Sequence, residues 1–422
     1  MARIYYSLYD RLLQEKRLLR AFAKVKSNKG AAGIDGQSVT DFAEHLAEEI
    51  ARLVRELQEK SYRPQPVRRV EIPKSDGGIR QLGIPAVRDR VVQQALLEIL
   101  QPIFDPDFHP SSYGYRPGRS CHQAIAKASL FIRRYRRRWV VDMDLSKCFD
   151  TLDHELIIQS FRRRVTDGSL LGLLRLFLQS GIMTTDGWQA SEQGSPQGGV
   201  ISPLIANVYL DAFDQQMKER GHRIVRYADD ILILSRSKRG AQNALAVARR
   251  ILEGELHLKV NERKSRIVHS REGAPYLGVK IGSRYTRIQD EKIQQFKDKV
   301  KRITRRNSPV NLEKVISDLN PVLRGFANYF RVAHCRKQYR ELSCWVRRRL
   351  RSKQLKLWKK PNRLHRRLRQ LGYQGEFKAI GMNLWRNAGS PLANYAMPNE
   401  WFQELGLFEL GRVETGYLPQ NY

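Results

Sequence analysis

Three aspartates have the residue type and the surroundings for metal-assisted chemistry. Asp229 and Asp230 are adjacent, and they stand where one apolar segment gives way to another. Neighbouring carboxylates repel each other unless cations neutralise them, and Mg²⁺ prefers oxygen ligands. Taken alone, this pair also fits an Asp-rich hairpin turn. Asp144 ends a second apolar segment, where a simple strand-end residue is the alternative interpretation.

If the two segments are neighbouring strands, the three carboxylates can bind metal ions together. Two divalent ions about 3.5–4 Å apart then activate the attacking and leaving oxygens of an in-line phosphoryl displacement. We therefore predict two Mg²⁺ ions, with Mn²⁺ as a substitute ion, held by Asp144, Asp229 and Asp230.

The surrounding pattern predicts the elements that position these residues. Short apolar runs predict strands at 139–144, 223–228 and 231–235, and a hairpin at 67–72 and 79–84. Helices are expected over 120–138, ending in the basic run at 133–138, and over about 153–164 and 169–180. A helix after Pro203 carries a core-facing stripe, and further strands are expected over 265–288. From about 290 onward the pattern is helical and basic. This order predicts an α+β domain followed by a helical one.

The charge balance points to a polyanionic partner. The 422 residues include 76 Lys and Arg against 43 Asp and Glu, a formal charge of +33. Such an excess is typical of nucleic-acid binding, although a solvated basic surface is the alternative. No apolar run is long enough to predict a membrane span. The four cysteines form no C-x-x-C pair, which disfavours a zinc ribbon and suits a cytoplasmic location.

Seven ordered segments resemble the conserved boxes of reverse transcriptases. Residues 227–230, Tyr-Ala-Asp-Asp, resemble the Y-x-D-D box, and 144–150 resemble the first carboxylate motif. The others resemble the fingers hairpin, a motif of the bacterial group II intron branch, the glycine-proline box and two later palm motifs; they are 72–85, 112–120, 194–204, 260–265 and 276–278. The resemblance implies a right-hand polymerase, in which fingers and an antiparallel palm sheet with packed helices precede an α-helical thumb.

The resemblance also implies roles for the metal-binding residues. Asp144 and Asp229 would bridge two Mg²⁺ ions, with the Leu145 carbonyl as a further ligand. Asp230 would support the ion on the primer side.

Five other positions receive nucleotide-binding roles by the same resemblance. Lys74 and Arg80 would hold the triphosphate, although a solvated hairpin face is the alternative. Gln197 would touch the incoming nucleotide, unless it belongs to an ordinary turn. Phe149 would block a ribose 2′-OH, with core packing as the alternative. Lys264 would protonate the pyrophosphate leaving group.

A basic stretch follows the expected palm. Residues 331–370 contain sixteen Lys or Arg and one acid, Glu341. Residues 325–330 and 345–350 resemble the maturase region of group II intron proteins, which implies binding to structured intron RNA by phosphates, 2′-hydroxyls and shape. A solvated amphipathic helix is the alternative. The predicted nucleic-acid contacts are Arg347, Arg348, Arg349, Arg351 and Lys353.

These patterns divide the chain into four predicted parts: an N-terminal helical extension over 1–60, fingers and palm over 61–288, a thumb and maturase domain over 289–375, and a tail over 376–422. The longest family members carry a C-terminal endonuclease with Cys and His ligands. No Cys or His occurs after residue 376. The chain therefore resembles the endonuclease-lacking, class C-like subgroup, and residues 385–422 receive no role.

The predicted function is RNA-directed DNA polymerisation combined with binding of group II intron RNA, assisting splicing and mobility. The expected partners are an RNA template, a DNA primer, deoxynucleoside triphosphates and intron RNA. One alternative is a stand-alone reverse transcriptase in phage defence or CRISPR spacer acquisition. Another is an RNA-binding splicing cofactor with a vestigial polymerase. The sequence predicts no oligomeric state.

Overall fold

The computed structural model describes residues 3–73, 77–184, 187–191, 193–195 and 198–422. Lys74 and Gln197 lie outside the described residues. The chain separates into two compact units. Unit 1 holds residues 3–131 and 135–268, and unit 2 holds 132–134 and 269–421. In the described part of the chain, no helix combines the length and apolarity needed to cross a bilayer.

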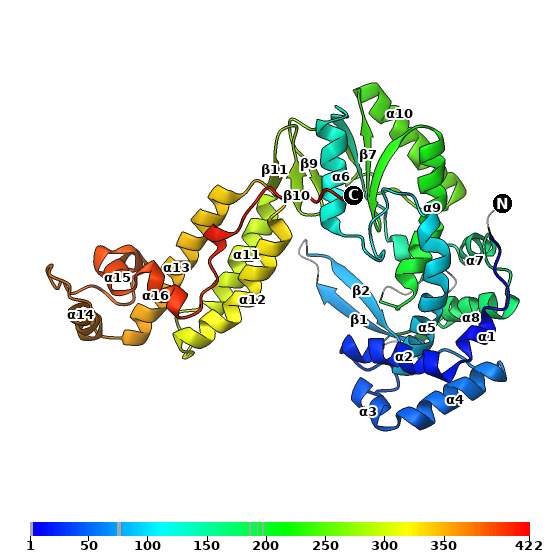
Figure 1. Cartoon of the computed structure of the whole chain (residues 1–422), viewed down its shortest axis with the longest axis horizontal. Helices are drawn as coiled ribbons and strands as arrows, with labels where there is room; N and C mark the ends of the chain where they lie inside the picture. The colour runs from blue at the N-terminus through cyan, green and yellow to red at the C-terminus, as the bar shows by residue number, and fades with distance from the viewer. Residues whose placement is uncertain (1–2, 74–76, 185–186, 192, 196–197) are drawn as a thin grey trace. The chain divides into compact units, whose positions relative to one another are not determined.

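The N-terminal part of unit 1 is helical, as expected, but it is more divided. Gln14 has an extended backbone conformation and separates the first two helices. Ser38 caps a third helix in a capping box with Asp41. Of these helices, α1, α2 and α3 pack against the long buried helix α5, and α4 packs against α2 and α3 (Figure 1). Their bounds are α1 (Tyr9–Leu12), α2 (Glu15–Ser27), α3 (Val39–Glu44), α4 (Leu46–Gln58) and α5 (Val87–Phe104).

The predicted fingers hairpin is confirmed, within a larger sheet. β1 (Val67–Pro73) pairs antiparallel with β2 (Ile79–Ile84), and Ile72 lies opposite Arg80. A second hairpin, β4 (Ile182–Thr184) and β5 (Gly187–Gln189), completes the order β2-β1-β4-β5, with β1 parallel to β4. These two strands were not predicted, because three residues each are too few to show a strand pattern.

The palm sheet has the order β6-β7-β3-β8. Its strands are β3 (Trp139–Met143), β6 (Arg223–Tyr227), β7 (Asp230–Ser235) and β8 (Arg266–His269). Helix α10 (Lys238–Arg249) packs against β7 and β3, and α9 (Ser202–Glu219) packs against β6. Residues 231–235 of the central strand β7 are all buried. The predicted antiparallel palm sheet with packed helices is thereby confirmed.

The other helices of unit 1 follow the expected pattern with one correction. The helix predicted over 120–138 is α6 (Cys121–Arg133), which ends inside the basic run. Arg136 has a positive φ of 54°, so the run turns instead of continuing as a helix. α7 (His154–Arg162) and α8 (Gly168–Gln179) lie close to prediction, and α10 continues into an unpredicted π-helical turn, η3 (Arg250–Glu255).

Unit 2 contains a small sheet and a set of helices. The order β11-β10-β9 is antiparallel, and the core includes the stacked rings of Phe296 and Phe326 at 4.1 Å. The expectation of helices alone after 290 is wrong for residues 373–384, which have no regular structure. The elements are β9 (Ala274–Tyr276), β10 (Val279–Ile281), β11 (Thr286–Ile288), α11 (Asp290–Ile303), α12 (Leu312–Phe330), α13 (Arg336–Trp358), α14 (Pro361–Gln370), α15 (Pro391–Ala396) and α16 (Asn399–Glu404).

Candidate active site

The adjacent aspartates lie in a tight turn. β6 ends at Tyr227 and β7 begins at Asp230, and these two residues are paired, so Ala228 and Asp229 form the whole turn. Ala228 has a φ of 57°, in the left-handed region that two-residue hairpins require. A residue with a Cβ is strained there, so neighbouring structure must hold this conformation.

Strand register brings Asp144 to the same place. Met143 on β3 lies opposite Ile231 on β7, so the next position along β3 faces Asp230. Neighbouring strands lie about 4.7–4.9 Å apart. The expected adjacency of the two carboxylate segments is confirmed, and Asp144, Asp229 and Asp230 meet at one end of the two central strands, β3 and β7.

Burial and neighbouring negative charge raise the pKa values of Asp229 and Asp230. Burial, together with the charges of Asp229, Asp144 and Asp142, raises the pKa of Asp230 to about 7. Burial and the charge of Asp144 also raise the pKa of Asp229, while Arg80 opposes the shift. The ionised cluster therefore lacks positive charge, which a divalent cation would supply.

The same side chains form no closed metal cage. Among the described residues, no three His, Cys, Asp or Glu side chains already stand together as a metal-ligand group. Mg²⁺ is commonly held by one or two carboxylates, with substrate phosphates and water completing its shell. An open shelf of hard oxygen donors fits an ion that arrives with a nucleotide.

Leu145 presents its backbone toward this shelf. It forms an isolated antiparallel bridge with Val260. The flanking hydrogen bonds run from the Asn261 N–H to the Asp144 carbonyl and from the Ser146 N–H to the Lys259 carbonyl, both at 2.9 Å. In such a non-hydrogen-bonded pair the backbone groups of the bridged residue point away from the partner. The Leu145 carbonyl therefore points away from Val260, toward the β7 side of the chain segment.

The Asp144 carboxylate is oriented by the same segment. Its Oδ2 accepts a hydrogen bond from Asn261 Nδ2 at 3.0 Å, and its backbone N–H donates to Ser265 Oγ at 3.2 Å. Lys264 Nζ lies 3.9 Å from the same Oδ2, with its side chain 59% exposed. Lys264 is thus at the edge of the carboxylate cluster and open to solvent.

Two residues near the shelf had received no role from the sequence. Asp142 lies two positions before Asp144 on β3, so both side chains point to the same face. Burial raises the pKa of Asp142 to about 6, although Arg266 lies 3.5 Å away. Tyr115 is exposed, and the charges of Asp229 and Asp230 add to the effect of burial in raising its pKa. The D-x-D alternation was the available signal for Asp142.

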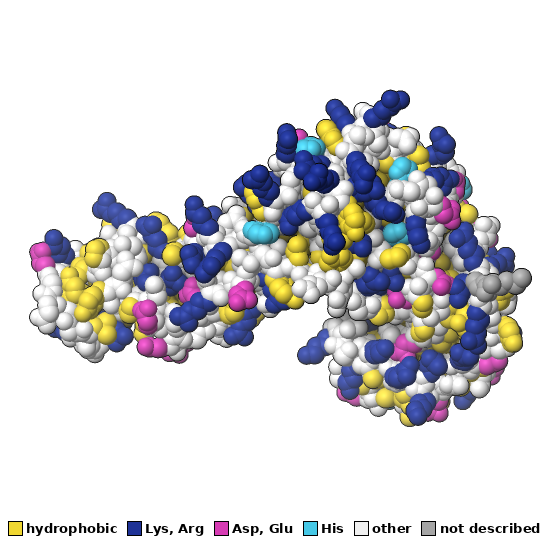
Figure 2. All heavy atoms as spheres, turned by 45° about the horizontal axis from the view of Figure 1, so that its top comes forward, with side chains coloured by type: hydrophobic (Ala, Val, Ile, Leu, Met, Phe, Trp, Pro, Cys, Tyr) yellow, Lys and Arg dark blue, Asp and Glu magenta, His cyan; other side chains and the backbone are white. Residues whose placement is uncertain are grey.

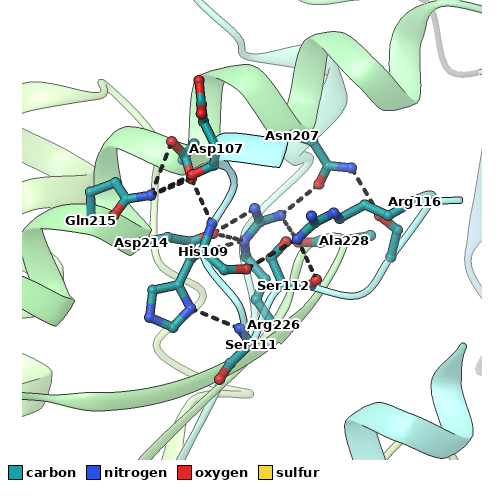
Figure 3. Close-up of polar contacts among 12 residues, drawn as sticks. Asp107, His109, Ser111, Ser112, Arg116, Asn207, Asp214, Gln215, Arg226 and Ala228 are labelled. Atoms are coloured by element: carbon teal, nitrogen blue, oxygen red, sulfur yellow. Dashed lines mark hydrogen bonds and ion pairs between the residues drawn. The ribbon is translucent and has the colours of Figure 1, made fainter. Parts of the chain in front are cut away.

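A buried ion pair lies beneath the turn (Figure 3). The Arg226 and Asp214 side chains are both fully buried. Arg226 Nε donates to the two Asp214 oxygens at 3.0 and 2.8 Å, and Nη2 donates to Oδ2 at 2.6 Å. A charge pair at this depth requires such complete hydrogen bonding to offset its lost hydration.

The remaining donor of Arg226 holds the strained turn. Its Nη1 donates to the Ala228 carbonyl at 3.0 Å and to Asn207 Oδ1 at 2.9 Å. Asn207 Nδ2 donates in turn to the Gly114 carbonyl at 2.8 Å. A Cβ on Gly114 would stand 2.3 Å from the Ala228 nitrogen, so only glycine fits there. The network connects the 112–120 motif to the turn that carries Asp229 and Asp230, a function that no local sequence signal indicated.

Phe149 lies largely within the core. Its side chain belongs to the main hydrophobic cluster of unit 1, and the residue is 9% exposed. Its carbonyl accepts a hydrogen bond from the Ser195 N–H at 2.7 Å. This bond ties the glycine-proline box to the first carboxylate motif. Core packing is therefore part of what Phe149 does.

The five cations predicted to contact nucleic acid are not one exposed surface. Lys353 is 0% exposed, and its Nζ donates to the Arg305 and Ser308 carbonyls and to Ser308 Oγ. Arg351 is buried and donates to the Met397 carbonyl at 2.9 Å. Both cations already donate hydrogen bonds inside unit 2, where a phosphate cannot reach them without rearrangement.

The other three are half-buried. Arg347 pairs with Glu409 at 2.6 Å, Arg349 Nε donates to Thr304 Oγ1 at 2.6 Å, and Arg348 lies over Trp385 at 4.9 Å. The residues after 385, which had no assigned role, therefore supply partners to α13. Within residues 336–370, the exposed cations lie at the start of α13 and on and just before α14; they are Arg336, Lys337, Arg340, Lys359, Lys360, Arg363, Arg366 and Arg369.

Two family descriptions match the chain. Residues 72–281 match reverse transcriptase (RNA-dependent DNA polymerase), and residues 293–372 match the group II intron, maturase-specific domain. Protein YkfC of Escherichia coli is 37% identical over 335 residues, which cover 68% of this chain and 88% of YkfC. Group II intron-encoded protein LtrA of Lactococcus lactis is 30% identical, over 66% of this chain and 57% of LtrA. The chain thus spans little more than half the length of LtrA.

Solved structures give weaker likenesses. A telomerase from Candida albicans, in complex with a fragment of telomeric RNA, aligns with a TM-score of 0.43 and 12% identity, covering 75% of this chain and 64% of that one. A Cas6-RT-Cas1–Cas2 complex aligns with a TM-score of 0.37 and 23% identity, covering 59% of this chain and 27% of the other.

Proposed function

The chain belongs to the reverse transcriptases of the group II intron type, and from this premise we propose that Asp144, Asp229 and Asp230 are its metal-binding catalytic residues. Members of this family are RNA-directed DNA polymerases whose maturase domain assists intron splicing and mobility. The observation that carries the proposal is the register of β3 on β7, which brings the three carboxylates together at one end of these two strands.

The proposed reaction is attack of a primer 3′-OH on the α-phosphate of a deoxynucleoside triphosphate, with an RNA template selecting the base. Bound at Asp144, Asp229 and the Leu145 carbonyl, two Mg²⁺ ions would supply activation of the hydroxyl and neutralisation of the leaving pyrophosphate. Asp230 supports the site on the primer side. Raised pKa values in the metal-free protein fit a cluster built to receive such charge.

The flanking cations suit the triphosphate. Arg80 on β2 is exposed, and its charge opposes the rise in the pKa of Asp229 and Asp230, so a role for its guanidinium in binding triphosphate oxygens is part of the proposal. Lys264, next to Asp144, is exposed and positioned to donate a proton to the leaving group. Lys74 and Gln197 keep their proposed roles in binding the triphosphate and the incoming nucleotide, outside the described residues.

Phe149 is proposed to select deoxyribose. It lies five residues after Asp144, and the edge of a ring anchored in the core would present a rigid wall to a ribose 2′-OH. The maturase function is proposed to use the exposed cations of α13 and α14 for intron RNA. The maturase match over 293–372 favours this role over a stand-alone defence function.

Primer extension on poly(rA)/oligo(dT) tests the catalytic proposal. We expect Asp229→Asn and Asp144→Asn each to lower kcat by about a thousandfold, because a metal ion supplies several kcal/mol of charge stabilisation. Glu48→Gln, which removes a carboxylate whose side chain is 85% exposed, is the matched control and should leave kcat unchanged. Full activity in Asp229→Asn would contradict the proposal.

A further inference from the structure

A second basic site lies in unit 1, at the far end of the hairpin that carries the catalytic turn. A cavity of about 440 Å³ opens where β6 begins and β7 ends. Arg223 lies four residues before Tyr227 on β6, which places the cavity about 13 Å from the turn at the usual rise of a strand. The cavity is therefore separate from the polymerase centre.

The cavity wall is strongly cationic. Its lining includes five Lys or Arg side chains, two His and two aromatic rings, and it includes no Asp or Glu; the nine residues are Lys127, Arg137, Lys218, Arg223, Arg236, His109, His222, Phe131 and Tyr135. Across the described residues, none of these five cations forms an ion pair within 4.0 Å. Figure 2 shows Lys and Arg side chains crowded around histidines on one face, with few acidic side chains among them.

These charges repel one another. Burial and the charges of Arg223 and Arg236 lower the pKa of Arg137, and burial with Arg119 and Arg223 lowers that of Lys127. Two carboxylates close to His109 already have partners: Asp214 is bound by Arg226, and Asp211 accepts the His109 backbone N–H at 3.1 Å. An anionic ligand would relieve this repulsion.

Two features indicate what kind of anion fits. His109 Nδ1 accepts a hydrogen bond from the Ser111 N–H at 3.0 Å, so the neutral ring carries its proton on Nε2 and offers a donor (Figure 3). Tyr135 is 46% exposed and provides an aromatic face. Its ring packs against that of Phe131 at 6.0 Å, which leaves the other side exposed. Donors for phosphate oxygens beside an exposed aromatic ring are the combination by which proteins bind single-stranded nucleic acid. The volume is also within the range of about 300–1,000 Å³ usual for a small-ligand site.

We propose that this pocket binds RNA, taking one unpaired nucleotide and its flanking phosphates at a position separate from the polymerase centre. Lys127, Arg137 and Arg223 hold the phosphates, and Tyr135 stacks on the base. The site would anchor a single-stranded RNA segment on the palm while the catalytic shelf works on a different part of the nucleic acid.

Salt-dependent binding of labelled single-stranded RNA to the full chain tests the proposal. Each phosphate contact contributes about 0.7 to the slope of log K against log salt for single strands. Lys127→Gln/Arg223→Gln should therefore make the slope shallower by about 1.4 and weaken binding about 25-fold at 0.1 M salt. The matched control, Arg239→Gln/Arg250→Gln, removes two exposed cations of unit 1 outside the pocket and should change the slope less than half as much.

Two further measurements make the test decisive. A photoreactive benzoyl-phenylalanine in place of Tyr135 should crosslink to the RNA. Primer extension by the Lys127→Gln/Arg223→Gln variant at saturating poly(rA)/oligo(dT) should stay within about twofold of the parent, which separates this site from the catalytic proposal. An unchanged salt slope in that variant would overturn the inference, as would an equal loss in the control. Binding of AMP or inorganic phosphate in the pocket, with RNA binding to the chain unaffected, would assign the pocket to a small phosphorylated ligand. That result would also overturn the inference.

Discussion

Removal of Arg226 tests whether the buried network sets the geometry of the catalytic turn. Arg226→Met leaves the Asp214 carboxylate fully buried without its partner. Breaking a buried pair in this way costs about 3–5 kcal/mol, a large part of the roughly 5–15 kcal/mol that stabilises a typical domain. The single variant is therefore expected to be strongly destabilised, and its loss of activity alone would say little about positioning.

The double variant Arg226→Met/Asp214→Leu separates the two effects. It removes both charges, and apolar replacement of a buried pair is often neutral. The Asn207 and Ala228 oxygens still lose their donor, at about 1–3 kcal/mol for each group left without a partner. We expect the double variant to recover at least about 1 kcal/mol of the single variant's loss.

Activity should not recover in parallel. Neither variant can hold the Ala228 carbonyl, and a misplacement of about 1 Å at a catalytic group can cost about 100-fold in rate. Urea denaturation gives the free energy of unfolding, and primer extension well below the melting temperature gives kcat and KM. The surface-pair variant Arg175→Met is the control and should lose less than about 1 kcal/mol and no activity.

We expect a fall in kcat in the double variant even when the protein is fully folded. A double variant that polymerises at the parental kcat would refute it, and Arg226 would then be a structural residue only. Weaker binding of the primer–template, seen as a raised KM with unchanged kcat, would also contradict a role in holding the catalytic turn.

Three other perturbations give separate outcomes. The pKa of Asp230 is raised to about 7 from an unfolded value near 4, so this group should make the metal-free protein less stable as pH rises from about 4 to 7. Asp230→Asn should flatten that pH dependence in thermal melts. Identical pH profiles for the variant and the parent would contradict the mutual repulsion within the carboxylate cluster. Phe149→Val should raise ribonucleotide incorporation in primer extension, and unchanged sugar selectivity would remove Phe149 as the gate. Arg363→Gln/Arg366→Gln on α14 should weaken intron-RNA binding and make its salt slope shallower by about 1.4–1.8, whereas Lys353→Met should alter stability without changing that slope; the reverse result would show that α14 is not the RNA-contacting face.

The sequence alone determined the chemistry of the site and the order of its elements. Asp229 and Asp230 could be recognised because adjacent carboxylates are costly unless a cation is bound, and Asp144 could be added because residues 144–150 and 227–230 both resemble reverse transcriptase motifs. The hairpin over 67–84 and the palm strands were predictable because period-2 apolar runs and Asp-Gly turns are local signals. These features depend on residues close together in the chain, so no knowledge of the fold was needed.

Only the tertiary structure decided which residues support that chemistry. Arg226 and Asp214 are twelve positions apart, and their pairing with Asn207 and Gly114 depends on how α9 packs beneath β6. Lys353 looked like a phosphate contact from composition, yet it follows the buried Val346 and Leu350 at helical spacing and is enclosed by α13's neighbours. Burial of a charge depends on what folds over it, and contacts between distant segments leave no mark in local sequence.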